Sequence, residues 1–547
     1  MRIDSFILLF LTAALAYGQK VAACHKGHSS PEYTMTPMLG PPLRAGIGTS
    51  ALKITTKSGD AQKYFTQGLA LLHCFWDFEA YRAFKEAARL DPAAPMAYWG
   101  IAQSIGAYKG MEDEKKAALE KAKALIENAS DQEQYYLRAL QAEPASEDYV
   151  SEMETLIGEY PEDSDAKVFF ALSRGGGYDD DDRPKPGTMY GLTLLRNVLA
   201  EQPNHPAANH YLIHLLEGGP HAAEALDAAD RLGKLAPASG HMVHMPGHIY
   251  YKLGDHQRAR EAFRTSMDVD EAYMRSENVA PRDDWNYAHN LSYLIASDAE
   301  AGRYREALEM AAKLEKLPAN PFLANGKPTH AMTVGSSTIR LHLRFGNWKA
   351  VIDHPLDVGN VGSAGPGALA FRDGVAAYAS GMQAVEDRHF EEASRQADVL
   401  DAIQWRLKTE NEKPGDKIFP LLTTASLDLR GNLKCAQGDT AGGFELLKKS
   451  GEKEVEIGYG EPPQYRRPQW ESLGYAYLRA GKFDDAREAF EEELEQRPKS
   501  GHALYGIALT FEKAGKKAEA AQANAKFLEA WKNADPDLAP MQRAKNP

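Results

Sequence analysis

The sequence has 547 residues, enough for several compact domains or for one elongated array of small repeats. Its hydrophobic fraction of 43% and charged fraction of 26% are typical of a soluble globular protein. The formal net charge of -14 argues against nucleic acid or an anionic membrane as the main partner, and it suits cationic or metallic ligands. The three cysteines, Cys24, Cys74 and Cys435, are too few for a disulfide framework, so packing must stabilise the fold.

The first residues have the pattern of an export signal. Arg2 precedes an apolar run from Phe6 to Tyr17 that is too short for a permanent membrane anchor, and residues 1–18 are expected to be cleaved before Gln19. A second interpretation stays open, in which the stretch ending at Cys24 is a lipoprotein box and Cys24 becomes the lipidated first residue. Only this alternative attaches the protein to a membrane. In both, the mature protein lies outside the cytoplasm, in the periplasm, lipid-anchored or extracellular.

Residues 19–57 are rich in Gly, Pro, Ser and Thr without periodicity, which predicts a flexible lead-in. From Gly59 onward the pattern is helix, short turn, helix. The first clear unit has small and aromatic residues at regular places, namely Gly68, Ala80, Phe84, Ala87 and Pro92. It resembles the tetratricopeptide repeat, a pair of antiparallel helices of about 34 residues with small residues where the helices touch. The proline ends the second helix.

The same spacing of small and aromatic residues, here called the repeat skeleton, recurs along the chain. The best copy has Trp470, Gly474, Tyr477, Ala486, Phe490 and Pro498, and another has Gly247, Tyr250, Ala259 and Phe263. Residues 93–175 fit the skeleton less well, and their periodicity predicts helices at Met96–Tyr108, Glu114–Asn128, Asp131–Gln141 and Ser146–Glu159. The predicted fold is therefore all-α, a right-handed superhelical solenoid of stacked antiparallel helix hairpins.

Two glycine-containing stretches interrupt the helical pattern. The first, Gly175–Gly187, contains the aspartates Asp179–Asp182 and is predicted to be a solvated loop, with cation binding as the alternative. The second, Gly359–Ala368, is expected to separate two halves of the array. We therefore predict an N-terminal helical array over residues 58–358, C-terminal repeats over residues 369–534 and a tail over residues 535–547.

Histidines are concentrated in one part of the array. Seven of the seventeen lie between His205 and His248. Within this stretch two sets are spaced by three and four residues, which places each set along one face of a helix. The first set is His210, His214 and Glu217, and the second is His241, His244 and His248. Counted from the repeat skeleton, His289 occupies the matching face of the next unit.

In tetratricopeptide arrays the first helix of each unit lines the concave surface, and the resemblance implies that these side chains point into one groove. Neighbouring helix axes lie about 8–10 Å apart, so imidazoles from successive helices can meet at common ions. Imidazole and carboxylate ligands suit copper, zinc or iron, and the donors exceed the needs of one tetrahedral ion, so we expect one or two ions. The predicted metal ligands are His210, His214, Glu217, His241, His244, His248 and His289.

The remaining histidines have simpler interpretations. Four of them are expected to be ordinary structural or solvent-facing residues: His205, His256, His342 and His502. His73, near the end of the first inner helix, is a weaker candidate for the site, and His221 is expected to serve the start of a helix.

Other uses of the groove also fit the pattern. A small anionic or aromatic ligand, a peptide or a partner protein would bind there, with histidine protonation tuning the affinity. Repeat proteins that clamp a peptide carboxylate use Lys, Arg and Asn on this face, and here His and Glu replace most of them. Asn286 and Asn290 are the residues placed to hydrogen-bond a peptide backbone.

The sequence contains no Walker loop, no GxSxG elbow, no CxxC pair and no HExxH motif. If the protein is an enzyme, its chemistry is therefore that of the bound metal, and the choice between hydrolase and oxidoreductase stays open. Residues near enough in sequence to assist are Tyr250, Tyr251, Trp285, Tyr287, and Asp283 or Asp284. From about residue 60 to residue 515 the chain also resembles a group of large exported bacterial tetratricopeptide-repeat proteins, which implies the fold and no named reaction.

Overall fold

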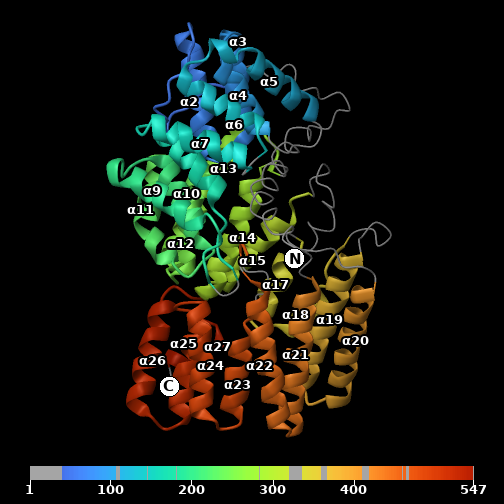
Figure 1. Cartoon of the computed structure of the whole chain (residues 1–547). Helices are drawn as coiled ribbons and strands as arrows, with labels where there is room; N and C mark the ends of the chain where they lie inside the picture. Colours follow the sequence, from blue (N-terminus) through green and yellow to red (C-terminus); the bar gives the residue numbers. More distant parts are fainter. Residues whose placement is uncertain are drawn as a thin grey trace. The chain divides into compact units, whose positions relative to one another are not determined.

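The computed structural model describes residues 40–105, 111–143, 146–179, 182–281, 284–318, 335–358, 366–409, 418–458, 460–462 and 467–545. Over these ranges the regular secondary structure is helical, apart from one isolated antiparallel bridge between Tyr178 and Pro184. The predicted all-α class is therefore confirmed (Figure 1). No described helix has the length and apolar character needed to cross a membrane. The predicted export signal and Cys24 lie outside the described residues.

The chain forms two compact units. The first comprises Met1–Tyr250, Glu261–Asn290 and Asn320–Ala324, and the second comprises Tyr251–Arg260, Leu291–Ala319 and Asn325–Pro547. The first unit contains α2 (Gly59–His73), α3 (Asp77–Leu90), α4 (Pro95–Ile105), α5 (Glu112–Ala124), η2 (Ile126–Asn128), α6 (Asp131–Gln141), α7 (Glu147–Glu159), α8 (Ser164–Arg174), α9 (Thr188–Glu201), α10 (Pro206–Glu217), η3 (Ala222–Ala225) and α11 (Leu226–Leu235). Three helices are divided between the units, namely α12 (Gly240–Lys252), α13 (His256–Glu277) and α14 (Trp285–Glu300).

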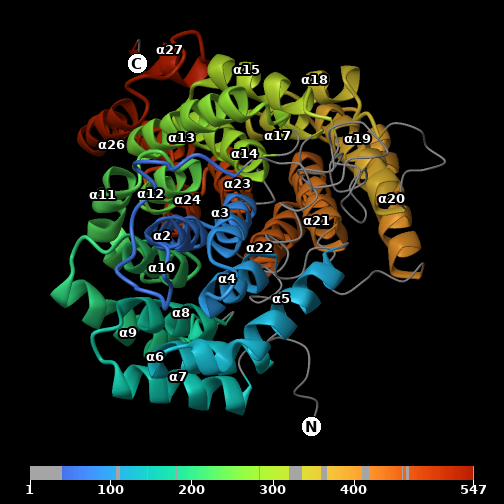
Figure 2. The same cartoon turned by 90° about the horizontal axis from the view of Figure 1, so that it is seen from above.

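The second unit continues with α15 (Tyr304–Glu315), α17 (Ser337–Arg344), α18 (Trp348–Asp353), α19 (Pro366–Glu386), α20 (Phe390–Thr409), α21 (Ile418–Gln437), α22 (Thr440–Ile457), α23 (Gln469–Arg479), α24 (Phe483–Gln496), α25 (Gly501–Lys513), α26 (Lys517–Ala530) and α27 (Ala539–Lys545). In each unit consecutive helices pack side by side as hairpins, for example α2 with α3 and α21 with α22 (Figure 2). The predicted stacked-hairpin architecture is confirmed.

The repeat skeleton owes its close helix packing to glycine–phenylalanine contacts. A Cβ atom added to Gly68 in α2 would lie 2.7 Å from the ring of Phe84 in α3. The same contact recurs between α12 and α13, where a Cβ on Gly247 would lie 2.4 Å from Phe263, and between α23 and α24. Phe84 and Phe263 are fully buried. A glycine is required at these places because any side chain would push the two helices of the hairpin apart.

The less regular region is also helical where the periodicity predicts it. The predicted helix Asp131–Gln141 is α6, and it begins with a capping box in which Ser130 and Glu133 bond each other's backbone. The other three predictions correspond to α4, to α5 followed by η2, and to α7, with the described boundaries shifted by one or two residues. The predicted end of the first of these helices, Tyr108, lies outside the described residues. Local capping and periodicity are therefore sufficient to place these helices.

The two predicted interruptions differ in outcome. Over its described residues, the stretch Gly175–Gly187 lies between α8 and α9 and is not helical, as expected. Two of its aspartates lie outside the described residues, so cation binding there stays a prediction. In the second stretch, residues 359–365 lie outside the described residues, but Pro366 opens α19, so the predicted loop extends too far. Proline is favoured at the first position of a helix, which explains the earlier start.

A buried ion-pair network stabilises the second unit. The guanidinium group of Arg344 donates to both carboxylate oxygens of Glu300, at 2.8 and 3.1 Å, and to both of Glu471, at 2.8 and 2.9 Å. All three side chains are almost fully buried. Because burying an unpaired charge is costly, these residues depend on one another.

Candidate metal centre

Helices α10 and α12 carry most of the histidines that the sequence singled out. Helix α10 begins at Pro206, and the preceding residue, His205, caps it by accepting a hydrogen bond from Ala208 N at 3.2 Å. Helix α12 begins at Gly240, where an added Cβ would lie only 1.7 Å from Asp270 Oδ1 of α13. A glycine at this position therefore lets the histidine-bearing start of α12 lie close to α13.

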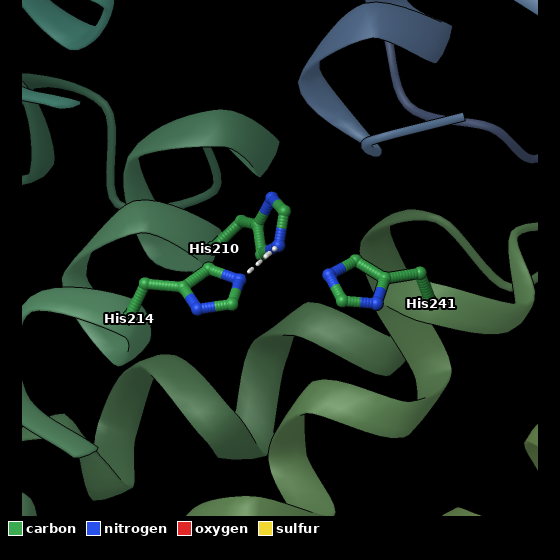
Figure 3. Close-up of side chains that lie close together, drawn as sticks. All are labelled: His210, His214 and His241. Atoms are coloured by element: carbon green, nitrogen blue, oxygen red, sulfur yellow. Dashed lines mark hydrogen bonds between the residues drawn. The ribbon is translucent and has the colours of Figure 1, made fainter. Parts of the chain in front are cut away.

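The structure brings the six predicted histidine ligands together in two groups of three. The first triad is His210 and His214 from α10 with His241 from α12, and Figure 3 shows the three rings turned toward one another. One nitrogen from each ring lies within 4.8 Å of the others. His210 Nε2 and His214 Nε2 are 3.0 Å apart. The ring of His241 lies 5.0 Å from that of His210 and 5.7 Å from that of His214, measured between centroids.

The second triad is His244 and His248 from α12 with His289 from α14. Its three ligand nitrogens also lie within 4.8 Å of one another. His244 Nε2 is 2.6 Å from His248 Nε2. The ring centroid of His289 lies 4.8 Å from that of His244 and 5.7 Å from that of His248. The two triads thus have the same internal arrangement, a facing pair from one helix and a third ring from the next.

The other ring nitrogen, Nδ1, is held by hydrogen-bond acceptors in both triads. His210 Nδ1 donates to the backbone carbonyl of His73 at 2.7 Å. His244 Nδ1 donates to Asn290 Oδ1 at 2.8 Å, while the amide group of Asn290 donates to the carbonyl of Phe263 at 2.6 Å. A carbonyl oxygen can only accept, so both rings carry their proton on Nδ1 and their lone pair on Nε2.

His241 is oriented in the same way. Its Nδ1 lies 3.4 Å from Asn286 Oδ1, and the amide group of Asn286 donates to Asp270 Oδ2 at 2.8 Å. His241 Nε2 is buried and has no hydrogen-bond partner among the described residues. Both Asn286 and Asn290 are therefore buried and engaged with histidines, which removes them from the peptide-binding role considered from the sequence.

Glu217 lies between the two triads on the Nδ1 side of the rings. Its Oε1 accepts a hydrogen bond from His214 Nδ1 at 2.8 Å, and its Oε2 lies 2.5 Å from His248 Nδ1. Burial opposes ionisation of this carboxyl, but the charges and hydrogen bonds of His248 and His214 outweigh burial and lower its pKa below the ordinary range. The ligand role that the sequence predicts for Glu217 stays a prediction, and in this structure each of its oxygens lies beside a histidine Nδ1 atom.

Facing lone pairs distinguish these triads from ordinary buried histidines. Burial and the neighbouring histidines lower the pKa of His210, His241 and His244 well below the ordinary value. His210 and His244 are neutral with their protons on Nδ1, so each presents an Nε2 lone pair to the facing Nε2 atom of His214 or His248. Two facing lone pairs repel, so a metal ion or a shared proton must lie between the two atoms to hold them this close. A tetrahedral ion with metal–nitrogen distances near 2.0–2.1 Å spaces its ligands by about 3.3 Å. The observed 3.0 and 2.6 Å separations need only small ring movements to reach that spacing.

Phe75 covers the first triad, and sequence reasoning missed it. Its ring centroid lies 4.7 Å from His210, 5.2 Å from His214 and 5.5 Å from His241. Its φ of 55° is left-handed, which costs a residue other than glycine about 1–2 kcal/mol. Phe75 follows α2 at the place where a helix usually ends in glycine, and that mismatch is the available sequence signal.

The remaining histidines have structural roles. His73 is buried, with Nδ1 2.9 Å from Tyr211 OH and Nε2 3.0 Å from Asp165 Oδ1, so it holds His210 only through its carbonyl. Burial lowers the pKa of His205 to about 4. His221 is exposed and makes no capping bond with its side chain, contrary to the prediction. His256, His342 and His502 belong to the second unit, whereas the residues of both triads belong to the first.

Among the assisting residues named from the sequence, Trp285 lies against the triads. Its ring centroid is 5.1 Å from that of His241 and 6.1 Å from that of His289. The hydroxyl of Tyr250 donates to Asp230, and that of Tyr287 donates to Glu271. Asp284 accepts from the backbone at the start of α14, Tyr251 belongs to the second unit, and Asp283 lies outside the described residues.

Comparisons with known proteins identify the repeat type. Residues 472–535 match the tetratricopeptide repeat family. No curated protein matches the chain. Solved structures with similar arrangements include the APC/C hetero-tetramer Cut9-Hcn1, at 14% identity and a TM-score of 0.30 over 88% of this chain and 76% of that one. The P58(IPK) TPR domain has 12% identity and a TM-score of 0.22 over 84% and 99% of the two chains. The human IFIT1 dimer with m7Gppp-AAAA has 14% identity and a TM-score of 0.30 over 87% and 90%.

The family match coincides with α23 to α26, which include the best copy of the skeleton in the sequence. The resemblance to tetratricopeptide repeats is thereby confirmed at the C-terminal end of the array. The chain is a helical protein whose residues 472–535 match the tetratricopeptide repeat.

Proposed function

We propose that the protein binds transition-metal ions through the six histidines of the two triads. The observation that carries the proposal is the pair of facing Nε2 atoms in each triad, 3.0 and 2.6 Å apart, in rings whose Nδ1 atoms are held by acceptors. Metal-binding histidines typically donate their second N–H to a carbonyl or carboxylate, which fixes the ring orientation. Both triads have that arrangement without rearrangement of their helices.

The donor set restricts the metal. Imidazole nitrogen suits zinc, copper and iron, whereas magnesium and calcium prefer oxygen ligands. With Glu217 engaged by Nδ1 atoms, the donors that converge in each triad are nitrogens. Three histidines leave an open position on a four-coordinate ion, the arrangement in which catalytic metals bind water or substrate. Copper, zinc and iron are therefore the proposed metals, and a metalloenzyme is compatible with the geometry.

The protein's own residues prepare the site in three ways. The His73 carbonyl, Asn286 and Asn290 set the tautomers of His210, His241 and His244. Burial keeps these rings neutral, so protons compete weakly with a metal at Nε2. Phe75 covers the first triad and limits access of water to it.

Elemental analysis of protein purified without a nickel column tests the proposal. The wild type should contain near-stoichiometric zinc, copper or iron, and His244→Ala and His214→Ala should lose metal with unchanged far-UV circular dichroism. His221→Ala is the matched control, because His221 is an exposed histidine of the same unit. A metal-free protein that also takes up no zinc, copper or iron on titration would refute the proposal.

The second candidate function is protein binding. Tetratricopeptide repeats are scaffolds for peptides and partner proteins, and residues 472–535 provide such a scaffold. Because the asparagines near the triads are engaged with histidines, we place this function with the C-terminal repeats. Screening the protein against a library of immobilised peptides should identify peptides that it binds. The His214→Ala and His244→Ala variants should bind the same peptides. Loss of peptide binding in these variants would instead place peptide binding at the histidine groove.

Export is a further part of the proposal. Mass spectrometry of the mature N-terminus distinguishes the two interpretations, because cleavage before Gln19 gives an unmodified chain and the lipoprotein route gives an acylated Cys24. A chain that retains Met1 in the cytoplasm would refute both.

A further inference from the structure

Glu217 places its Oε1 beside His214 of the first triad and its Oε2 beside His248 of the second. Building on the proposed function, we infer that the histidines form a two-ion centre, with one ion in each triad, and that Glu217 is a positioning residue shared by both ions. Glu217 has no role as a ligand in this arrangement. It holds His214 for one ion and His248 for the other.

The division into two ions follows from where the third histidines point. His241 and His244 are one turn apart on α12, with centroids 6.1 Å apart and rings nearly parallel. His241 nevertheless groups with the α10 pair, whereas His244 groups with His248 and His289. Six nitrogen donors exceed what one four-coordinate ion can use, and each group of three is complete by itself. Two separate ions therefore use every histidine of the cluster.

Two features indicate that both ion sites depend on Glu217: its side chain is buried, and each of its two oxygens contacts a histidine of a different triad. The side chain is 4% exposed, so water cannot replace it as an acceptor without rearrangement. Each oxygen serves one ring, His214 Nδ1 at 2.8 Å and His248 Nδ1 at 2.5 Å. Two neighbouring cations repel, and a carboxylate hydrogen-bonded to a ligand of each one places its negative charge where it stabilises both. Loss of this carboxylate should therefore weaken both ions together.

Substitutions at Glu217 separate a shared role from a local one. Glu217→Leu keeps the volume and removes both acceptors, so both sites should lose about 10–100-fold in affinity, the usual effect of removing such a partner. Glu217→Gln keeps one acceptor oxygen and turns an N–H₂ group toward the other ring, so one site should recover and the other should stay weak. Glu224→Gln is the control, since Glu224 is a half-exposed carboxylate of the same unit.

The experiment is a titration of the metal-free full chain with cobalt(II) chloride, followed by visible d–d absorption. The wild type should bind two equivalents with the intense bands of tetrahedral nitrogen coordination. His241→Ala and His289→Ala, one from each triad, should each keep one tight equivalent, and circular dichroism should show that every variant is folded. If Glu217→Leu does not fold, the wild type, Glu217→Gln and these two variants still decide the result.

The possible outcomes separate this inference from the proposed function. Binding of one equivalent that either His241→Ala or His289→Ala abolishes would overturn the two-ion centre and leave metal binding intact. Two equivalents of which Glu217→Leu weakens only one or neither, or wild-type affinity at both sites in Glu217→Gln, would overturn the shared role of Glu217. No cobalt, zinc or copper binding at all would refute the proposed function itself.

Discussion

Gly247→Ala should destabilise the protein even though alanine is the better helix former. A Cβ at this position of α12 would lie 2.4 Å from Cε1 of Phe263, whereas ordinary contacts are 3.4–4 Å. The ring must therefore move by about 1 Å. Phe263 is fully buried, and its ring centroid lies 4.8 Å from His244 and 6.2 Å from His248, so it cannot withdraw without disturbing the second triad.

The size of the effect follows from two opposing contributions. Overpacking a well-filled core costs about 1–3 kcal/mol. Replacing glycine by alanine within a helix stabilises the folded state by about 0.5–1 kcal/mol. The expected net loss is about 0–2.5 kcal/mol, which lowers the melting temperature of a chain of this length by up to about 2 °C. Metal affinity at the second triad should fall as well, because His244 and His248 share the displaced ring as a neighbour.

Thermal unfolding followed by circular dichroism measures this effect, with Gly158→Ala as the matched control. Gly158 lies in α7, is exposed, and has no neighbouring atom within 4 Å of the added Cβ. The free energy of unfolding of the Gly158→Ala control should rise by about 0.5–1 kcal/mol, since only the helix propensity changes. A melting temperature for Gly247→Ala at or above that of Gly158→Ala would show that α12 and α13 do not pack as described.

The remaining predictions concern the site and the second unit. The pKa values of His210, His241 and His244 lie well below the ordinary 6.5, so protons should displace the metal only well below pH 6.5, and metal release measured with a chromogenic chelator at about pH 6.5 would contradict this. Saturating metal at 100 times its dissociation constant should stabilise the fold by about 2.7 kcal/mol, and an unchanged melting temperature would exclude preferential binding to the folded state. Phe75→Gly removes the left-handed strain at this residue and uncovers the first triad. EDTA should therefore extract the metal of the first triad faster from this variant than from the wild type, and an equal rate would show that the Phe75 ring does not shield the triad. Arg344→Ala leaves two buried carboxylates unpaired and should cost about 3–5 kcal/mol in urea unfolding, and a loss under 1 kcal/mol would show that the network is dispensable.

Residue spacing was sufficient to predict the helices and the histidine faces. The intervals in His210, His214 and Glu217 are set by the helical repeat, so the sequence alone places these side chains on one face of α10. The glycine and phenylalanine of each repeat are likewise local signals, because they mark where two consecutive helices touch.

The division into triads could not be predicted from spacing. His241 and His244 lie on the same helix, and only tertiary packing decides that one ring joins α10 and the other joins α14. The position of Glu217 depends on the same packing, since one of its partners is on its own helix and the other is on α12. Phe75 contacts histidines more than a hundred residues away, so its role becomes visible only once α2 is placed beside α10.

X-ray absorption spectroscopy at the edge of the metal found in the purified protein tests metal binding by the two histidine triads. We expect a first coordination shell of nitrogen at about 2.0–2.1 Å, with the outer-shell scattering of imidazole rings. This shell should be lost from the first triad in His241→Ala and from the second in His289→Ala. A first shell containing sulfur, or oxygen alone without imidazole scattering, would contradict metal binding by the two histidine triads.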